Sequence, residues 1–267
     1  MKNPLSHFGI LAVLLLSFTI ANTASANHTW GNYHWARATP SFTLLLGNNL
    51  SNTWDPFLDT TSSDWSTSTV LNTVVVAGNT NDIKGKNTPK NCTPTSGRGE
   101  VCNAKYGANG WLGIASIWAS GNHITAGTVK LNDTYFGTAT YNKPAWRNMV
   151  MCQEVGHIFG LGHQDETFDN TNLDTCMDYT NNPESNQHPN QHDYDLLDAM
   201  YAHLDTTTTV ASGATTLTQD SNDVNDWGNE VHRSDNGRAS IFVKDVGNGN
   251  RVLRHVYWTE PRGNDHE

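Results

Sequence analysis

Short apolar stretches separated by polar segments run through the first half of the chain and predict several strands. β-branched or alternating apolar positions favour strands at residues 42–46, 70–77, 110–118 and 124–131. The weaker pattern at residues 54–69 fits either a helix or irregular structure. Residues 80–105 are rich in Asn, Gly, Lys and Pro and show no periodicity, so they predict a loop.

The second half of the chain carries two helical patterns. The stronger begins at Pro144 and continues to about residue 159. Proline suits a first helical turn because its missing N–H would have no partner there, and Gly160 and Gly162 end the pattern. A second helix is predicted over residues 193–203, where an apolar stripe indicates a face packed on the core. The stripe consists of Leu196, Leu197, Met200 and Tyr201.

The C-terminal residues 206–267 are expected to form a linker followed by a small β-rich segment. Four consecutive threonines at 206–209 indicate the linker. Residues 239–243 and 252–258 are rich in β-branched and aromatic side chains, and the sequence GNGN at 247–250 lies between them. This pattern predicts a β-hairpin appended to a main domain at residues 27–205.

The first 26 residues are interpreted as a signal peptide. A weakly positive head precedes an apolar run at residues 8–20, and Ala24-Ser25-Ala26 supplies the small residues needed for cleavage. The alternative is a single membrane helix, but the run is short for one. The mature protein, beginning near Asn27, is therefore expected to be secreted and free of the membrane.

The charge of the chain limits the classes of partner it can bind, and its cysteine content bears on disulfide formation. The net charge of −10, without any basic run, argues against nucleic acid or an anionic membrane as a partner. Four cysteines in a secreted chain predict disulfides in one of three pairings. The turn-rich stretch between Cys92 and Cys102 favours a local loop, which leaves Cys152 to pair with Cys176. A four-cysteine metal site is the alternative, but no CxxC spacing supports it.

The chemistry of the chain is concentrated in the sequence CQEVGHIFGLGH at residues 152–163. Gln153 and His157 are four residues apart and share one face of the predicted helix, with Glu154 adjacent. Gly160 lets the chain leave the helix sharply, so that His163 can return to the same point. Two imidazoles and one further group converging in this way suit a tetrahedral zinc ion with an open position.

This stretch resembles the metzincin signature H-E-x-x-H-x-x-G-x-x-H, which is followed by a Met-turn. Every fixed position matches except the first, where Gln153 replaces histidine. The sequence CMDY at residues 176–179 is similar to the Met-turn, which would place Met177 under the metal. Tyr179 is similar to the tyrosine that astacins and serralysins place near zinc. The resemblance covers residues 42–203 in element order.

The resemblance implies an α+β fold with a twisted mixed sheet, an active-site helix, a Met-turn and a C-terminal helix. It implies a secreted zinc endopeptidase that acts on protein or peptide substrates, with Glu154 as the general base. The metal ligands would be Gln153, His157 and His163, and Tyr179 would either stabilise the oxyanion or ligate zinc weakly when substrate is absent. Residues 112–117 would be the edge strand that pairs with an extended peptide.

The glutamine at position 153 leaves two interpretations open. Its amide oxygen either ligates zinc more weakly than an imidazole, or the metal is lost and the fold serves as a secreted binding module. The completeness of the remaining site favours zinc. His123, His188 or His192 could supply a missing ligand, although their spacing recommends none. A zinc hydrolase acting on another substrate class is a third possibility.

A calcium site is a further expectation in the loop between His163 and the Met-turn. Oxygen-bearing side chains cluster there, as calcium prefers, although the EF-hand pattern is absent. A solvated acidic loop is the alternative interpretation. The residues concerned are Asp165, Glu166, Asp169, Asn170, Asn172 and Asp174.

Overall fold

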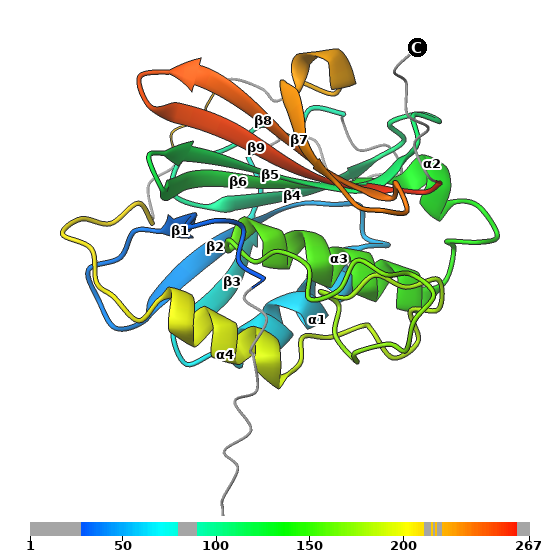
Figure 1. Cartoon of the computed structure of the whole chain (residues 1–267), viewed down its shortest axis with the longest axis horizontal. Helices are drawn as coiled ribbons and strands as arrows, with labels where there is room; N and C mark the ends of the chain where they lie inside the picture. The colour runs from blue at the N-terminus through cyan, green and yellow to red at the C-terminus, as the bar shows by residue number, and fades with distance from the viewer. Residues whose placement is uncertain (1–27, 80–89, 211–214, 216, 218–220, 261–267) are drawn as a thin grey trace, which may run out of the picture.

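The computed structural model describes residues 28–79, 90–210, 215, 217 and 221–260, and these form an α+β structure. The expected signal peptide at residues 1–26 lies outside the described residues. One large mixed sheet forms a layer, and helices cover one of its faces (Figure 1). Within the described ranges, every helix is too short or too polar to cross a membrane.

The sheet has nine strands in the described part of the chain, eight of them in the order β3-β2-β4-β6-β5-β9-β8-β7, while β1 pairs with β6 outside this path. Strands β2, β3, β4 and β6 run parallel, and β5, β9, β8 and β7 continue the sheet in antiparallel pairs. The strands are β1 (His34–Trp35), β2 (Phe42–Asn49), β3 (Leu71–Ala77), β4 (Gly99–Ala104), β5 (Trp111–Ser120), β6 (His123–Asn132), β7 (Asn229–Arg233), β8 (Ala239–Gly247) and β9 (Asn250–Trp258).

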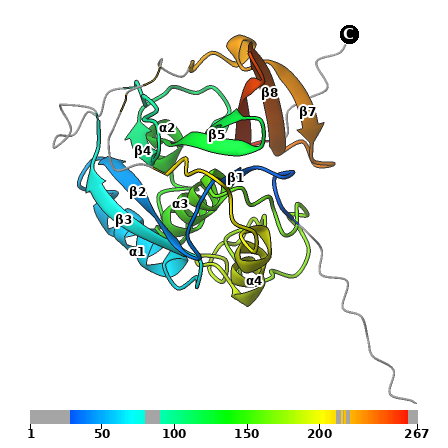
Figure 2. The same cartoon turned by 90° about the vertical axis from the view of Figure 1, so that its left-hand side faces the viewer.

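The three longest helices, α1 (Asp55–Trp65), α3 (Pro144–Ile158) and α4 (Gln191–Met200), lie on the same side of the sheet (Figures 1 and 2). The helix predicted from Pro144 is confirmed, with proline in its first turn. The other predicted helix begins earlier than expected, because Asn190 and Asp193 form a capping box that fixes its start. The short α2 (Asp133–Phe136) and a 3₁₀ turn (Val224–Asp226) complete the set.

Helix α3 is central to the fold because it is buried along most of its length. It packs against β5, β6 and α1. Two strand glycines let its C-terminal end approach the sheet closely: a Cβ atom at Gly99 would lie 2.5 Å from Cδ1 of Ile158, and one at Gly127 would lie 3.0 Å from its Cβ. This close packing fixes the height of His157 above the sheet.

The prediction of a loop over residues 80–105 is wrong for residues 99–104, which form β4 in the interior of the sheet. All six residues of β4 are buried, so no alternation marks the strand. Glu100 also argued against a buried strand, because a carboxylate is rarely buried unless it is paired. Here it accepts hydrogen bonds from Arg98 and Asn49. The predicted disulfides, Cys92–Cys102 and Cys152–Cys176, are both confirmed.

The C-terminal hairpin is confirmed as β8 and β9, but it is not a separate appendage. Strand β9 pairs with β5 along its whole length, from Trp111 opposite Trp258 to Ser120 opposite Asn250. The expectation that residues 112–117 form an edge strand is therefore wrong, since β5 lies between β6 and β9. Burial of the β9 side chains explains the pairing: Leu253, Val256 and Tyr257 are each at most 3% exposed.

Candidate metal centre

The end of helix α3 and the turn after it bring the two motif histidines together. His157 lies in the last turn of α3, and the chain reverses at Gly160, where φ is +99°. This conformation suits glycine. The space is also restricted, because a Cβ atom at Gly160 would lie 2.2 Å from the carbonyl oxygen of Tyr33. The reversal returns His163 to His157, with 3.0 Å between their Nε2 atoms.

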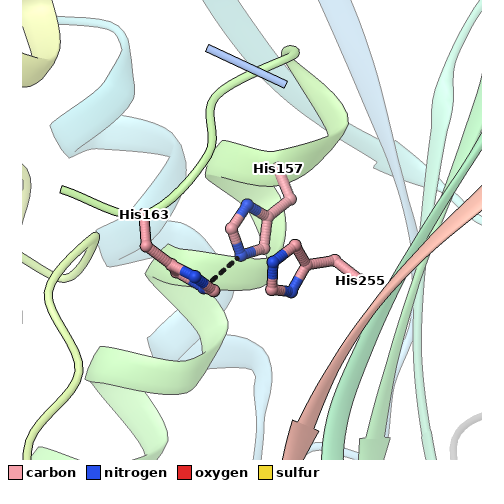
Figure 3. Close-up of side chains that lie close together, drawn as sticks. All are labelled: His157, His163 and His255. Carbon is pink, nitrogen blue, oxygen red and sulfur yellow. Dashed lines mark hydrogen bonds between the residues drawn. The ribbon is translucent and has the colours of Figure 1, made fainter. Parts of the chain in front are cut away.

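A third histidine, His255 of β9, completes the cluster (Figure 3). Its ring stacks on that of His157 with centroids 3.9 Å apart, and it meets the His163 ring edge-on at 4.2 Å. One nitrogen from each of the three rings lies within 4.8 Å of the others. Sequence reasoning missed His255, because only the pairing of β9 with β5 brings it to this point.

The hydrogen bonds around the cluster leave nitrogens free to bind a metal. Nδ1 of His157 donates to the carbonyl of Leu161 at 2.8 Å, and Nδ1 of His163 lies 3.1 Å from Oε1 of Glu166. Both contacts turn the Nε2 atoms toward each other, as partners of metal-bound histidines commonly do. Neither ring nitrogen of His255 has a hydrogen-bond partner among the described residues. Zinc fits this donor set, since two nitrogens on a tetrahedral zinc ion lie about 3.3 Å apart.

Burial keeps the three imidazoles neutral, which is the form that binds metals. The side chains of His157, His163 and His255 are at most 1% exposed. Desolvation lowers the pKa of His157 to about 4. It also lowers the pKa of His163 and of His255 well below the usual range, and the neighbouring imidazoles act in the same direction. Each ring is therefore deprotonated at neutral pH.

Gln153 is buried one turn before His157. Its Nε2 donates to the carbonyl of Cys176 at 2.9 Å, which fixes the plane of the amide. Its Oε1 is buried and makes no hydrogen bond to a described residue. An acceptor left in this state carries an energetic cost that a cation could relieve. Ligation by Gln153 stays a prediction.

Glu154 lies on the sheet side of α3, against β5. Its Oε1 would be 2.4 Å from a Cβ atom at Gly113, so glycine at that position makes room for the carboxyl group. Burial raises the pKa of Glu154 well above its ordinary value, and the backbone amide of Ala115 offsets part of this effect. Neither carboxyl oxygen makes a hydrogen bond of ordinary geometry to a described residue. When ionised, this carboxylate is therefore a stronger base than that of an exposed glutamate.

The turn at residues 176–179 packs against α3 and against His163. The Sδ of Met177 packs on α3, where a Cβ atom at Gly156 would lie 2.6 Å from it, and the Cys152–Cys176 disulfide ties the turn to the helix. The Tyr179 ring lies 4.0 Å from that of His163, and its hydroxyl is buried without a partner among the described residues. Burial, and then the nearby Glu154, raises the pKa of Tyr179 well above 10, so the hydroxyl keeps its proton.

The three histidines considered as replacement ligands lie elsewhere. His123 belongs to a different cluster, His188 contacts Asp64, and His192 stacks on His28. Carboxylates of the expected calcium loop make separate local contacts: Asp165 accepts from Asn170, Asp169 accepts from Asn181, and Glu166 contacts His163 and His232. They do not gather into one metal-sized group among the described residues. Calcium in this loop stays a prediction.

The free energy of unfolding of the metal-free protein should fall as pH drops from about 6.5 to 4. Because the folded-state pKa of His157 is about 4, the unfolded chain binds protons in this window while the folded chain does not. The loss from His157 alone is about 3 kcal/mol, complete once pH falls below the folded pKa. Urea unfolding in the presence of a metal chelator, at pH 7.5 and at pH 4.5, measures this change in the free energy of unfolding.

The control for this prediction is His157→Gln, because other buried groups titrate in the same window. Burial raises the pKa of Asp193 to about 6, and this group favours the folded state as pH falls. The variant keeps Asp193 but loses the imidazole, so its stability should depend less steeply on pH. Equal pH dependence in wild type and variant would contradict the prediction.

No protein-family model matches this chain, and no curated protein resembles it closely enough to count as a relative. The convergence of His157, His163 and His255 is the feature of this centre that bears on its chemistry.

Proposed function

We propose that this protein is a zinc-dependent endopeptidase whose catalytic centre is closed in this conformation. The observation that carries the proposal is the convergence of His157 and His163, whose Nε2 atoms lie 3.0 Å apart, at the end of the helix that also carries the buried Glu154. Zinc would be held by these imidazoles. When bound, it would polarise a peptide carbonyl and make water a stronger nucleophile at neutral pH.

The residues of the chain have distinct roles in this reaction. Glu154 accepts a proton from the attacking water and returns it to the leaving amine, which its raised pKa favours. Tyr179, protonated and without a partner, donates its hydroxyl hydrogen to the developing oxyanion. The disulfide between Cys152 and Cys176 holds the Tyr179 turn against α3 and keeps the two groups in place.

Strand β9 lies where an extended peptide would pair with β5. It runs antiparallel to β5 and carries His255 into the centre, so the same strand fills the peptide position and contacts the metal position. In our proposal, β9 must withdraw before substrate binds. His255 is then a ligand of the closed form, and Oε1 of Gln153 replaces it in the open form.

Replacing His255 should therefore activate the protein. In His255→Ala the link between β9 and the metal is lost, so the open form becomes more populated. We expect peptide hydrolysis to rise at least roughly tenfold, since the lost link should exceed about 1.4 kcal/mol. Zinc content should remain near one at this centre because Gln153 takes over. Elemental analysis and cleavage of a quenched fluorescent peptide library measure both quantities.

The exposed His188, paired with Asp64 away from the centre, provides a matched control. His188→Ala should leave hydrolysis and zinc content as in wild type. If His255→Ala loses its zinc, and neither wild type nor His255→Ala hydrolyses peptides, the proposal of an endopeptidase is refuted.

Loss of zinc from His255→Ala without any hydrolysis would support a different function, that of a secreted binding module with a structural metal. Two observations favour this candidate: the three imidazoles are at most 1% exposed, and β9 fills the edge of β5. In that case His255 is a permanent ligand, and the metal fastens the C-terminal strands to α3. Partners would then bind at β7, which is one of the two end strands of the sheet, the other being β3.

A further inference from the structure

A second group of metal-ligating side chains lies at the start of β6, just after the turn that follows β5. It contains His34 of β1, His123 of β6 and Asp205, which follows α4. One ligand atom from each lies within 4.8 Å of the others. Oδ1 of Asp205 is 3.5 Å from Nε2 of His34 and 3.2 Å from Nε2 of His123.

His203 supplies a fourth donor beside this group. Its Nε2 lies 3.1 Å from Nε2 of His34 and 3.8 Å from Oδ1 of Asp205. The His34 ring meets the His123 and His203 rings nearly at right angles, with centroids 5.1 and 4.6 Å away. Three imidazole nitrogens thus face one carboxylate oxygen. The four residues come from three segments that are far apart in the sequence.

Backbone contacts orient two of these ligands from behind. Nδ1 of His34 donates to the carbonyl of Asn32 at 2.8 Å, so its proton lies on Nδ1 and Nε2 is a free acceptor. Oδ2 of Asp205 accepts from the amide of Arg37 at 2.9 Å, which leaves Oδ1 for the cluster. Outer contacts that fix the tautomer of a histidine and the rotation of a carboxylate are typical of metal sites.

The spacing of these ligand atoms fits their binding to one tetrahedral cation better than direct hydrogen bonds between the side chains. Two acceptor nitrogens 3.1 Å apart repel unless a proton or a cation lies between them. Ligands on a tetrahedral zinc ion lie about 3.3 Å from one another, and four of the ligand pairs here are 3.1 to 3.8 Å apart. His203 lies outside the group whose ligand atoms are all within 4.8 Å of one another, so its ring would have to move toward His123 to complete the tetrahedron. Imidazole with one carboxylate is a donor set suited to zinc, and four protein ligands leave no position for substrate.

We propose that His34, His123, His203 and Asp205 form a structural zinc site, independent of the function assigned to the His157 centre. The metal would join β1, the start of β6 and the end of α4. Two backbone hydrogen bonds, from Asp205 N to Arg37 O and from Thr209 N to Ala36 O, join the same two segments of the chain. The site thereby fastens the chain that leads from α4 toward the C-terminal strands onto the N-terminal segment.

Zinc counting in the full-length mature protein tests this site. After dialysis against buffered zinc, elemental analysis should find about two zinc ions in wild type and one fewer in His123→Ala. His123 is suited to replacement because its side chain is 40% exposed at the start of β6, where truncation leaves no core cavity. Zinc added to the metal-free protein should raise the Tm of wild type more than that of the variant.

Two further variants separate this site from the other centre. His188→Ala, an exposed histidine outside both clusters, should retain the wild-type zinc content. His163→Ala should lose the other ion and keep the one proposed here. A single zinc ion in wild type that His123→Ala removes supports this site and counts against the His157 centre. Zinc content and Tm shift unchanged in His123→Ala overturn the proposal.

Discussion

Glu154→Ala is expected to abolish peptide hydrolysis while leaving the fold and the zinc content intact. A positioned general base contributes about 10²- to 10⁴-fold to such a reaction. Glu154 is not among the clustered metal donors, so the metal should remain. Stability should not suffer through lost hydrogen bonds, because the carboxyl makes none of ordinary geometry.

The measurement is the cleavage rate of the same peptide library in wild type and in the His255→Ala background, where the centre should be open. Glu154→Gln should be equally inactive, because an amide cannot accept the proton. Glu184→Ala, at an exposed glutamate, is the matched control and should cleave at the parent rate. Hydrolysis close to the parent rate in Glu154→Ala would remove Glu154 from the proposed reaction.

Gly160→Ala is expected to have the largest effect on stability. The substitution places a Cβ atom 2.2 Å from a backbone oxygen and 2.9 Å from Cε of Met200, at φ +99°. Only the methionine end can move away. We expect the free energy of unfolding to fall by about 3 kcal/mol or more, from backbone strain and the clash together. His163 should also shift, so zinc binding at its centre should weaken.

Gly247→Ala separates the clash from the conformational cost. Gly247 has a similar φ of +87°, but no atom lies within 4 Å of the Cβ position. This variant should lose only about 1 kcal/mol and should keep its zinc. Urea unfolding and elemental analysis of both variants make the comparison. Equal destabilisation of the two proteins would show that Gly160 is needed only for its φ angle.

Several local features of the fold were predictable because they depend on neighbours in the sequence. Proline at the first turn and glycine past the last defined α3 almost to the residue. The spacing from His157 to His163 placed both on one centre, with Gly160 as the reversal. The turn-rich stretch before Cys102 gave the first disulfide, and the second followed.

Features that depend on distant partners were not predictable in the same way. Strand β4 was missed because a short strand buried on both faces has no alternation, and because its Glu100 needs Arg98 and Asn49 to be tolerated inside. The second cluster escaped notice since His34, His123 and Asp205 meet only after β1 pairs with β6.

The sequence by itself determined the motif helix, the reversal after it and the two histidines that face each other. Only the tertiary structure decided that His255 joins them and that β9 covers β5. The physical reason is the range of the interactions. Helix periodicity, caps and turns act over a few residues, whereas strand pairing is chosen by the burial of whole apolar faces, and many registers satisfy one strand's local pattern.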